Sequence, residues 1–559
     1  MIAAIENKFS KFLAIGLFII TVLVVAGPVA DPVNTPKMAA LGTLSFGLIP
    51  FLIVGFKQNL SRGHFANYGL VLVFSILTVI SMLGSNSPLS QNLYGVFGRN
   101  TGVLTYISFT LIYLAASIFQ SKQSHKYILH SLLFAGLVNI VYGFIAEFIG
   151  DPIPWTNIYN ALLGTFGNPN FSGAFYGLTS SVFLGYMLGY NKEFKFKILF
   201  GILMASSLYC VLLTKTKQGL LVSALTISVI IFIYIRTNVK KKMLQISFVG
   251  GFAICFIFSV LGMLQKGPFA SYLYKESVSL RGSYWNAAFE AGKANLLTGV
   301  GFDSLGDWYR RSRSEKAATW LPGPEVITNS AHNYYLDIFS NGGILLLVAY
   351  ICFTIIGFVN ALRIVRRMQN FDYVGSVLVA VFIGFQAQAV ISIAQIGLAV
   401  WGWALAGLLF SYARLEDGVV ITKKPKKPIN TSLPFGVLSF ISMSLGFILS
   451  IPAFSADAKW MNATKSQSLQ KVEAALVPNY FNPLSSVRML NAIVLLEKNA
   501  FYEEAHAYAI KLTEFNPDFF EGWQALYLAA KTTEYERSIA LKEMRRLDPL
   551  NKRLDKFTK

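Results

Sequence analysis

Apolar runs of membrane-spanning length constrain this chain more than any other feature. A helix needs about 20 apolar residues to cross a bilayer, and 54% of the 559 residues are hydrophobic while 14% are charged. We predict that thirteen runs each form one span: 12–30, 38–56, 65–84, 102–120, 127–150, 171–190, 196–213, 219–235, 243–264, 343–362, 373–396, 398–413 and 434–453. The sequence therefore predicts an all-α, polytopic membrane helix bundle.

The basic residues predict how these spans are oriented. They alternate from side to side of the apolar runs, and every cluster is cytoplasmic if the N-terminus is: Lys8, Lys11, Lys57, Arg62, Lys122, Lys126, Lys192, Lys195, Lys197, Arg236, Lys240, Lys241, Lys242, Arg363, Arg366, Arg367, Arg414, Lys423, Lys424, Lys426 and Lys427. Short cytoplasmic loops carry such an excess of Lys and Arg. Membrane topology thus explains the net charge of +20, and we expect no nucleic-acid partner.

Two polar regions interrupt the apolar pattern, and both are predicted to lie outside the cytoplasm. The membrane domain, 1–453, contains a large loop at 265–342, and loops of this length are uncommon without a function. Residues 454–559 are predicted to form a second, helical domain. Its Asn-Pro and Asp-Pro turn signals place prolines at 483, 517 and 549, close to the 34-residue period of tetratricopeptide (TPR) helix pairs. We predict a TPR-like domain that binds a protein partner, with an ordinary helical hairpin domain as the alternative.

His332 is the strongest candidate for a catalytic group. It lies in SAHNYYLDIFSNGG (330–343), where the large loop ends and a span begins. The other histidines fall at cytoplasmic ends of spans or in the tail: His64, His125, His130 and His506. Only His332 is placed where a membrane enzyme meets a lipid-borne substrate on the outer face. The alternative is a histidine that satisfies backbone groups at a helix start.

Four cations on the outer face break the charge pattern. Arg99 lies in GVFGRNTGVLTY, Lys215 and Lys217 lie in the short turn TKTKQG, and Arg281 begins RGSYW in the large loop. Snorkelling to lipid phosphates explains any one of them, but four cations near His332 predict a shared anionic ligand. A lipid-linked diphosphate fits, because Arg binds phosphate through bidentate hydrogen bonds and Lys as a point charge.

Amide side chains accompany these cations. In GTFGNPNFSGAF (164–175), Asn168 and Asn170 flank Pro169 where the sixth run begins. We expect Asn170 to cap the following helix, and the remaining amide groups to bind a sugar or phosphate oxygen. Asn333 follows His332 and is predicted to orient its ring or to bind sugar.

In this order and on one membrane face, the motifs resemble the O-antigen ligase/polymerase superfamily. The resemblance covers residues 90–415 and rests on the GNPN loop, the glycine-flanked basic turn, the Arg-x-x-x-Trp segment, GVGFDS (299–304) and AHNYYLDIFSNGG. It implies a glycosyltransferase of the bacterial cytoplasmic (inner) membrane that uses undecaprenyl-diphosphate-linked glycans at the outer face, without metal, nucleotide or other cofactor.

The resemblance also assigns roles to single residues. The histidine that is essential in the family corresponds to His332, which is cast as the base, and Arg99 and Arg281 match two of its arginines. The family's basic turn usually reads Ser-Arg-Gly or Ser-Arg-Ala, whereas this chain has Thr216-Lys217-Gln218-Gly219. Lys217 is therefore the counterpart of that arginine, and it cannot form the bidentate fork.

These assignments predict direct, inverting transfer of a glycan to a hydroxyl of an acceptor, as in an O-antigen ligase. His332 takes the acceptor proton, while Arg99, Arg281, Lys217 and Lys215 bind the diphosphate. A repeat-unit polysaccharide polymerase and a protein O-oligosaccharyltransferase are alternatives within the same chemistry. A secondary transporter is an alternative of another class, disfavoured because Glu147 is nearly alone among ionisable groups within the spans.

Overall fold

The computed structural model describes residues 2–53, 56, 64–154, 156–191, 193–274, 276–415, 435–466 and 468–558. Regular structure in these ranges is helical, which confirms the all-α class. Seven of the basic residues used for the orientation lie outside the described residues: Lys57, Arg62, Lys192, Lys423, Lys424, Lys426 and Lys427.

The thirteen predicted runs fall on thirteen helices of the bundle. These are α1 (Ile2–Val22), α2 (Asn34–Gly47), α4 (Phe65–Leu83), α6 (Val103–Ser117), α7 (Lys122–Phe148), α8 (Pro169–Gly189), α9 (Phe194–Leu213), α10 (Lys217–Tyr234), α11 (Lys242–Met263), α16 (Tyr334–Arg367), α17 (Tyr373–Ala389), α18 (Ile396–Leu415) and α19 (Phe435–Ser450). Short helices α5 (Leu89–Tyr94), η1 (Gly164–Phe166) and η2 (Ile235–Val239) lie between them.

The count of thirteen spans is not confirmed. By length and composition, the described residues contain eight helices suited to cross a membrane, or nine if α19 and the helix after it form one bent span. The apolar helices α6 and α17 are shorter than that, and α1 carries Glu6, Lys8 and Lys11 in its first half. The Glu6 carboxylate is buried and accepts hydrogen bonds from the backbone N–H of Gln120 and Ser121, at 2.9 and 3.0 Å. In α1, Glu6 thus serves packing within the bundle.

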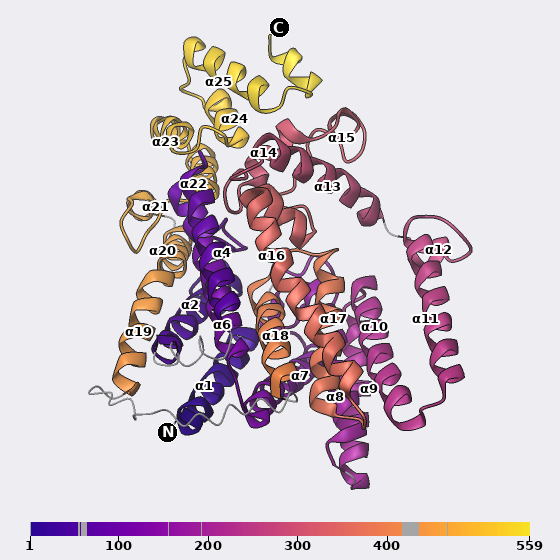
Figure 1. The fold of residues 1–559 in the computed structure, drawn as a ribbon. Helices are drawn as coiled ribbons and strands as arrows, with labels where there is room; N and C mark the ends of the chain where they lie inside the picture. Colours follow the sequence, from indigo (N-terminus) through magenta and orange to yellow (C-terminus); the bar gives the residue numbers. More distant parts are fainter. Residues whose placement is uncertain are drawn as a thin grey trace.

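The two ends of the bundle differ in charge and in what covers them. The ends of α7, α9, α10 and α16 that carry basic clusters lie at the end where the N-terminus lies, and the C-terminal domain covers the opposite end (Figure 1). This arrangement matches the alternation seen in the sequence. The side of the membrane on which each end lies stays a prediction.

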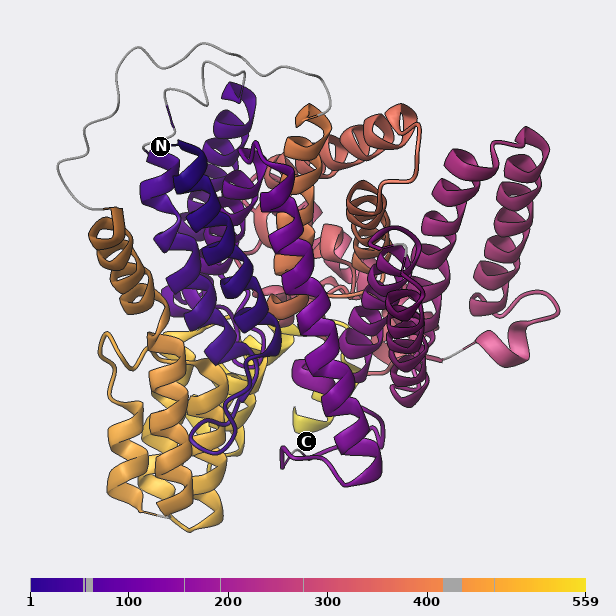
Figure 2. The same ribbon diagram turned by 90° about the horizontal axis from the view of Figure 1, so that it is seen from below.

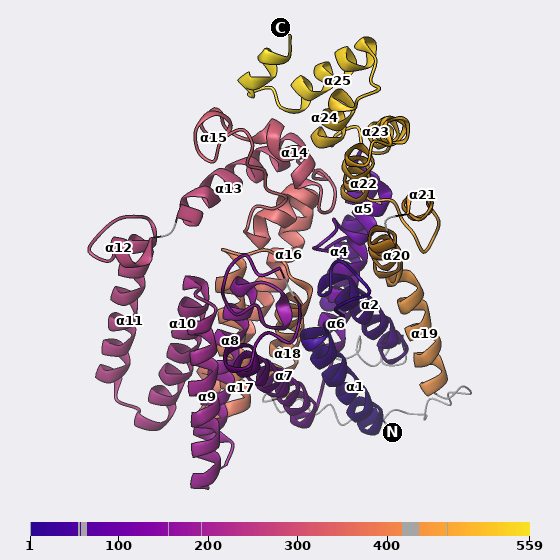
Figure 3. The ribbon, with the colours of Figure 1, turned by 180° about the vertical axis from the view of Figure 1, so that it is seen from behind.

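Helix α11 stands apart from the rest of the bundle (Figures 1 and 3). Its side chains are mostly apolar and mostly exposed, with Met243 at 82% and Ile246 at 72% of full exposure. A helix that is apolar all round and packs on so little protein is suited to a lipid environment. Seen along the bundle in Figure 2, α11 lies on the side away from the C-terminal domain.

The large loop folds into α12 (Ala270–Leu273), α13 (Glu276–Ala294), α14 (Leu305–Ser312) and α15 (Glu315–Thr319). It returns to α16, which begins nine residues before the predicted span and breaks at Gly343, with φ at 76°. A Cβ atom at Gly343 would lie 2.5 Å from the backbone of Leu297. Across the break, the N–H of Val300 donates to Ser340 at 2.8 Å and the N–H of Ile344 donates to Leu296. The glycines of GVG and NGG therefore let two backbone segments meet.

The tail consists of α20 (Pro452–Ser466), α21 (Leu469–Leu476), α22 (Ser486–Lys498), α23 (Tyr502–Phe515), α24 (Phe520–Leu528), α25 (Glu534–Leu547) and η3 (Lys552–Thr558). Helix α20 continues from α19 at an angle of 46°. The turn signals at Asn482, Asn516 and Asp548 fall between or after helices, as predicted. The helices pair in succession, α22 with α23 and α24 with α25, and the two pairs share an apolar core. Their identity as TPR units stays a prediction.

Candidate functional site

A cavity of about 450 Å³ lies where the large loop covers the bundle. Six elements that are distant in sequence line it: the loop at 159–161, the start of α8, the turn into α10, the segment from α11 to α13, the loop before α16, and the turn after α17. The lining residues are Tyr159, Ala161, Pro169, Asn170, Thr214, Lys215, Thr216, Lys217, Gln218, Leu221, Met263, Leu273, Leu280, Arg281, Tyr284, His332 and Ile391.

The cavity brings together five of the eight residues predicted from the sequence. His332, Arg281, Lys217, Lys215 and Asn170 all line it. None of the lining residues is acidic, so the three cations make the cavity electropositive. One part of the wall, from α10 to α13, is formed by leucine and methionine side chains. The cavity thus has a cationic wall next to an apolar one.

A network of hydrogen bonds fixes the backbone of His332. Its φ of 53° lies in the left-handed region, which is uncommon for a residue with a side chain. The N–H of His332 donates to Ser330 Oγ at 3.0 Å. The buried carboxylate of Asp337 accepts from Ser330 Oγ at 3.3 Å and from the N–H of Ala331 at 2.7 Å. The first turn of α16 therefore holds the histidine in this conformation.

The surroundings of the His332 ring favour its neutral form. The pKa of His332 is lowered from 6.5 to about 4, chiefly by burial and also by the positive charges of Arg99 and Arg281. The ring of Tyr284 lies beside it, with the ring centres 5.8 Å apart. At neutral pH the imidazole is uncharged, which is the protonation state that a general base requires.

Arg99 does not line the cavity, but its charge acts on His332. It lies in a turn between α5 and α6 that is bound to the large loop by Asp303 of the GVGFDS motif. The Asp303 carboxylate accepts from the N–H groups of Val96 and Thr101, both at 3.1 Å, and from Thr101 Oγ1 at 2.6 Å. This carboxylate therefore sets the position of the turn that carries Arg99.

Close packing of two glycines positions Lys217. A Cβ atom on Gly219 would lie 2.9 Å from the backbone of Gly173, so α8 and α10 approach more closely than side chains would allow. Thr216 caps α10 through its Oγ1, which accepts from the N–H of Gly219 at 3.3 Å. Lys217 thus lies on the first turn of α10, beside the start of α8.

The other two cations of the wall differ in their contacts. The ammonium of Lys215 donates to the carbonyl of Asn160 at 2.6 Å, so it already holds the loop at 160 in place. Arg281 lies on α13 and forms no ion pair with a carboxylate in the described part of the chain. Burial lowers the pKa of its guanidinium. A partly buried cation without a carboxylate partner is a candidate to bind an anionic ligand.

The helix caps correct one expectation. The cap of α8 is Asn168, whose Oδ1 accepts from the N–H of Asn170 at 2.9 Å. Pro169 takes the first helical position, so Asn170 is already inside the helix and its side chain is directed to the cavity wall. Asn333 caps α16, its Oδ1 accepting from Tyr335 and Leu336 N–H groups at 3.0 and 3.2 Å. Neither Asn168 nor Asn333 lines the cavity.

Sequence reasoning missed three residues that shape the site. Asp303 and Asp337 were overlooked as buried carboxylates, although an acid within GVGFDS and another five residues after His332 were visible signals. Tyr284 shares the RGSYW segment with Arg281, and it places an aromatic ring against His332. All three lie next to residues that were singled out for their charge.

The fold and the cavity together define a multi-pass membrane protein with a cationic, histidine-bearing site at one end of its bundle. Residues 200–351 match the family model described as O-Antigen ligase. This segment is therefore similar to O-antigen ligases, which supports the O-antigen ligase/polymerase superfamily and glycosyl transfer of that type by a membrane enzyme. His332, Arg281, Lys215 and Lys217 lie within the matched segment, whereas Arg99 lies outside it. None of the curated proteins matches this chain.

Proposed function

We propose that this protein transfers a glycan from an undecaprenyl-diphosphate-linked donor to a hydroxyl acceptor, as an O-antigen ligase of the bacterial cytoplasmic membrane. The active site and the tail lie on the outer face. The observation that carries the proposal is the neutral, half-buried His332 in one cavity with Arg281 and Lys217.

The two walls of the cavity suit the two halves of such a donor. A diphosphate carries dense negative charge, and Arg281, Lys217 and the nearby Arg99 supply positive charge without a competing carboxylate in the lining. The polyprenyl chain is apolar, and the leucine and methionine wall continues towards the lipid-exposed α11. Asn170 adds an amide for a sugar or phosphate oxygen. Lys215 contributes positive charge without direct contact to the donor, because its ammonium stays bound to the carbonyl of Asn160.

In the proposed reaction, the acceptor oxygen attacks the anomeric carbon while the bond from that carbon to the diphosphate oxygen breaks. The bonding electrons leave with the polyprenyl diphosphate, and the cations stabilise the charge that develops on it. His332 takes the proton of the acceptor hydroxyl. Direct displacement inverts the anomeric centre. Every step uses groups of this chain, the donor and the acceptor.

Donor binding changes the basicity of His332 in the useful direction. Two of the three causes that lower its pKa are the charges of Arg99 and Arg281. A bound diphosphate neutralises both, so the pKa of His332 rises when the donor is present. The imidazole thereby becomes a stronger base only in the complex that needs one.

The test is glycan transfer by purified protein in nanodiscs, with a lipid-diphosphate glycan donor and a panel of acceptors. We expect His332→Ala to lower the rate about 10²- to 10⁴-fold, the usual contribution of a general base, with donor binding retained. His506→Ala is the matched control, since His506 lies in the tail and contacts Glu536 at 3.1 Å.

Each outcome of this assay has a clear meaning. The productive acceptor distinguishes lipid A core ligation from polysaccharide polymerisation and from protein glycosylation. Full transfer by His332→Ala would remove this residue from the mechanism. Movement of bound donor across proteoliposomes, without transfer to any acceptor, would favour the transporter instead.

A further inference from the structure

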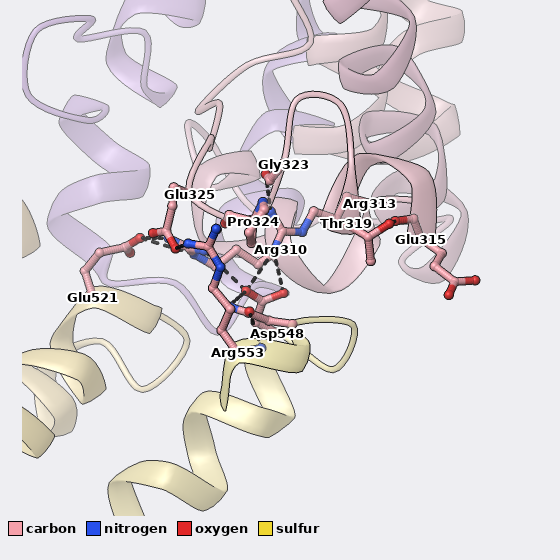
Figure 4. A network of polar contacts seen from close by, with 11 residues as sticks. Arg310, Arg313, Glu315, Thr319, Gly323, Pro324, Glu325, Glu521, Asp548 and Arg553 are labelled. Atoms are coloured by element: carbon pink, nitrogen blue, oxygen red, sulfur yellow. Dashed lines mark hydrogen bonds and ion pairs between the residues drawn. The ribbon is translucent and has the colours of Figure 1, made fainter. Parts of the chain in front are cut away.

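The tail is bound to the large loop through a buried cluster of charges (Figure 4). The carboxylate of Asp548, just after α25, accepts from Nη2 of Arg313 with both oxygens at 2.8 Å. Both side chains are fully buried. Nη1 of Arg310 donates to the same carboxylate at 3.3 Å, and its Nη2 donates to Glu521 of α24 at 2.9 Å. Two arginines of the loop thus obtain their counter-charges from the tail.

The same two arginines hold the segment that leads to His332. Nη1 of Arg313 donates to the carbonyls of Gly323 and Pro324, at 3.3 and 3.1 Å. Nη1 of Arg310 also donates to Pro324, at 3.0 Å. Pro324 precedes His332 by eight residues in an irregular stretch that ends in the Ser330 and Asp337 network. Each guanidinium therefore links a carboxylate of the tail to the backbone of this stretch.

A second, independent contact joins the tail to the other wall of the site. The half-buried Asp307 of α14 accepts from Nδ2 of Asn516 in the tail at 3.2 Å. It also accepts from Nε2 of Gln91 in α5 at 3.0 Å. Helix α5 leads directly into the turn that carries Arg99. The tail thus touches the elements that position both Arg99 and His332.

Burial makes these contacts obligatory for the loop. A buried ion pair that loses one partner leaves an uncompensated charge, which is strongly destabilising. Without Asp548, the fully buried Arg313 would lose its carboxylate partner and would have to move towards water, and the carbonyls that it holds at 323 and 324 would move with it.

We propose that Asp548 is a positioning residue of the active site, acting through Arg310 and Arg313 to hold the loop that carries His332 over the cavity. The tail is then part of the catalytic scaffold, beyond any partner that it recruits. The proposal rests on the proposed function only for its kinetic consequence, because the mechanical link is measurable without it.

The first test measures the mechanical link in the full-length protein in nanodiscs. Hydrogen exchange of the backbone at 320–332 is compared between wild type, Asp548→Asn and a control, Glu503→Gln. Glu503 forms an exposed ion pair with Lys531 within the tail, at 2.8 Å. We expect Asp548→Asn to lose protection in this stretch while Glu503→Gln keeps it. Unchanged protection in a folded Asp548→Asn protein would overturn the proposal.

The second test is kinetic and separates positioning from general destabilisation. In Asp548→Asn we expect kcat to fall about 10-fold or more, as for small misplacements of catalytic groups, with KM nearly unchanged. The acid limb of kcat/KM should also move upwards, because a loosened loop admits water and burial is the main cause of the low pKa of His332. A purely structural defect lowers the amount of active protein and leaves that limb in place, and this result would refute the positioning role.

Two further variants keep the proposal testable. If Asp548→Asn fails to fold, Glu521→Gln removes only the outer partner of Arg310 and should give a smaller change of the same kind. Asp548→Glu restores the charge and should recover part of kcat. If wild type transfers no glycan, the proposed function fails, whereas the exchange experiment still decides the link between tail and loop.

Discussion

The protonation of His332 gives the sharpest quantitative prediction. Its pKa is lowered from 6.5 to about 4, which corresponds to a preference of about 3 kcal/mol for the neutral ring. Activity that needs the neutral ring should therefore persist in mild acid. The acid limb of kcat/KM, which reports the free enzyme, is expected near pH 4, and activity should be lost as the pH falls through that value.

Replacing one neighbouring cation should move this limb. Arg281→Met removes a positive charge but keeps an apolar side chain, so the pKa of His332 should rise. Lys293→Met is the control, because Lys293 lies on the same helix, is 66% exposed and pairs with Glu290. The assay is glycan transfer between pH 3.5 and 8 at low donor concentration.

The result that decides this test is the pH at which kcat/KM falls on the acid side, and not the overall rate. Arg281 is also proposed to bind the diphosphate, so Arg281→Met should lower kcat/KM at every pH. A wild-type limb near pH 6.5 would show that the ring is solvated and would refute the reasoning. So would a limb that stays in place in Arg281→Met. The pKa of His332 also makes the stability of the fold depend on pH. In the unfolded chain the imidazole is protonated below pH 6.5, whereas in the folded chain it is protonated only near pH 4. The free energy of unfolding therefore increases as the pH rises from about 4 to 6.5.

Two further predictions concern residues that position the site. Asp303→Ala leaves three donors of the Arg99 turn without their acceptor. It should lower the free energy of unfolding by several kcal/mol, at about 1–3 kcal/mol for each buried group, and should abolish transfer. Thermal unfolding and kcat/KM measure these effects, and wild-type kinetics would contradict the prediction. Gly219→Ala forces a Cβ atom against the backbone of Gly173 and should cost about 1–3 kcal/mol with loss of transfer. Gly250→Ala on α11, where nothing lies within 4 Å, should be tolerated, and equal effects of the two glycine variants would refute the close-packing argument.

Local sequence patterns predicted the helices and the chemical character of the site well. Apolar runs place helices because burial in lipid or protein is the main force on such segments. The runs did not reveal which helices are long and apolar enough to span, since α6 and α17 are shorter than their runs suggested. Charge on the predicted outer face singled out Arg281 and Lys217, which the fold brings into one cavity.

Long-range partners could not be predicted in the same way. Asp303 contacts a turn about 200 residues earlier in the chain, and no local pattern encodes that pairing. The prediction that Asn170 caps α8 was wrong because proline at the first helical position shifts the cap to Asn168. The sequence predicted a tail that binds a partner, but it did not reveal that Asp548 of the tail pairs with Arg310 and Arg313 of the loop.

The position of Asp548 along the chain has a consequence for biogenesis. It pairs with Arg313, which is separated from it by 235 residues, so a ribosome completes the whole bundle before this carboxylate is made. Until then the fully buried Arg313 lacks its carboxylate partner, and the loop over the cavity is not yet held by it. A chain cut short within the tail would therefore insert into the membrane with its spans in place and remain silent. Under the proposed function, this delay would keep an incomplete chain from consuming its glycan donor.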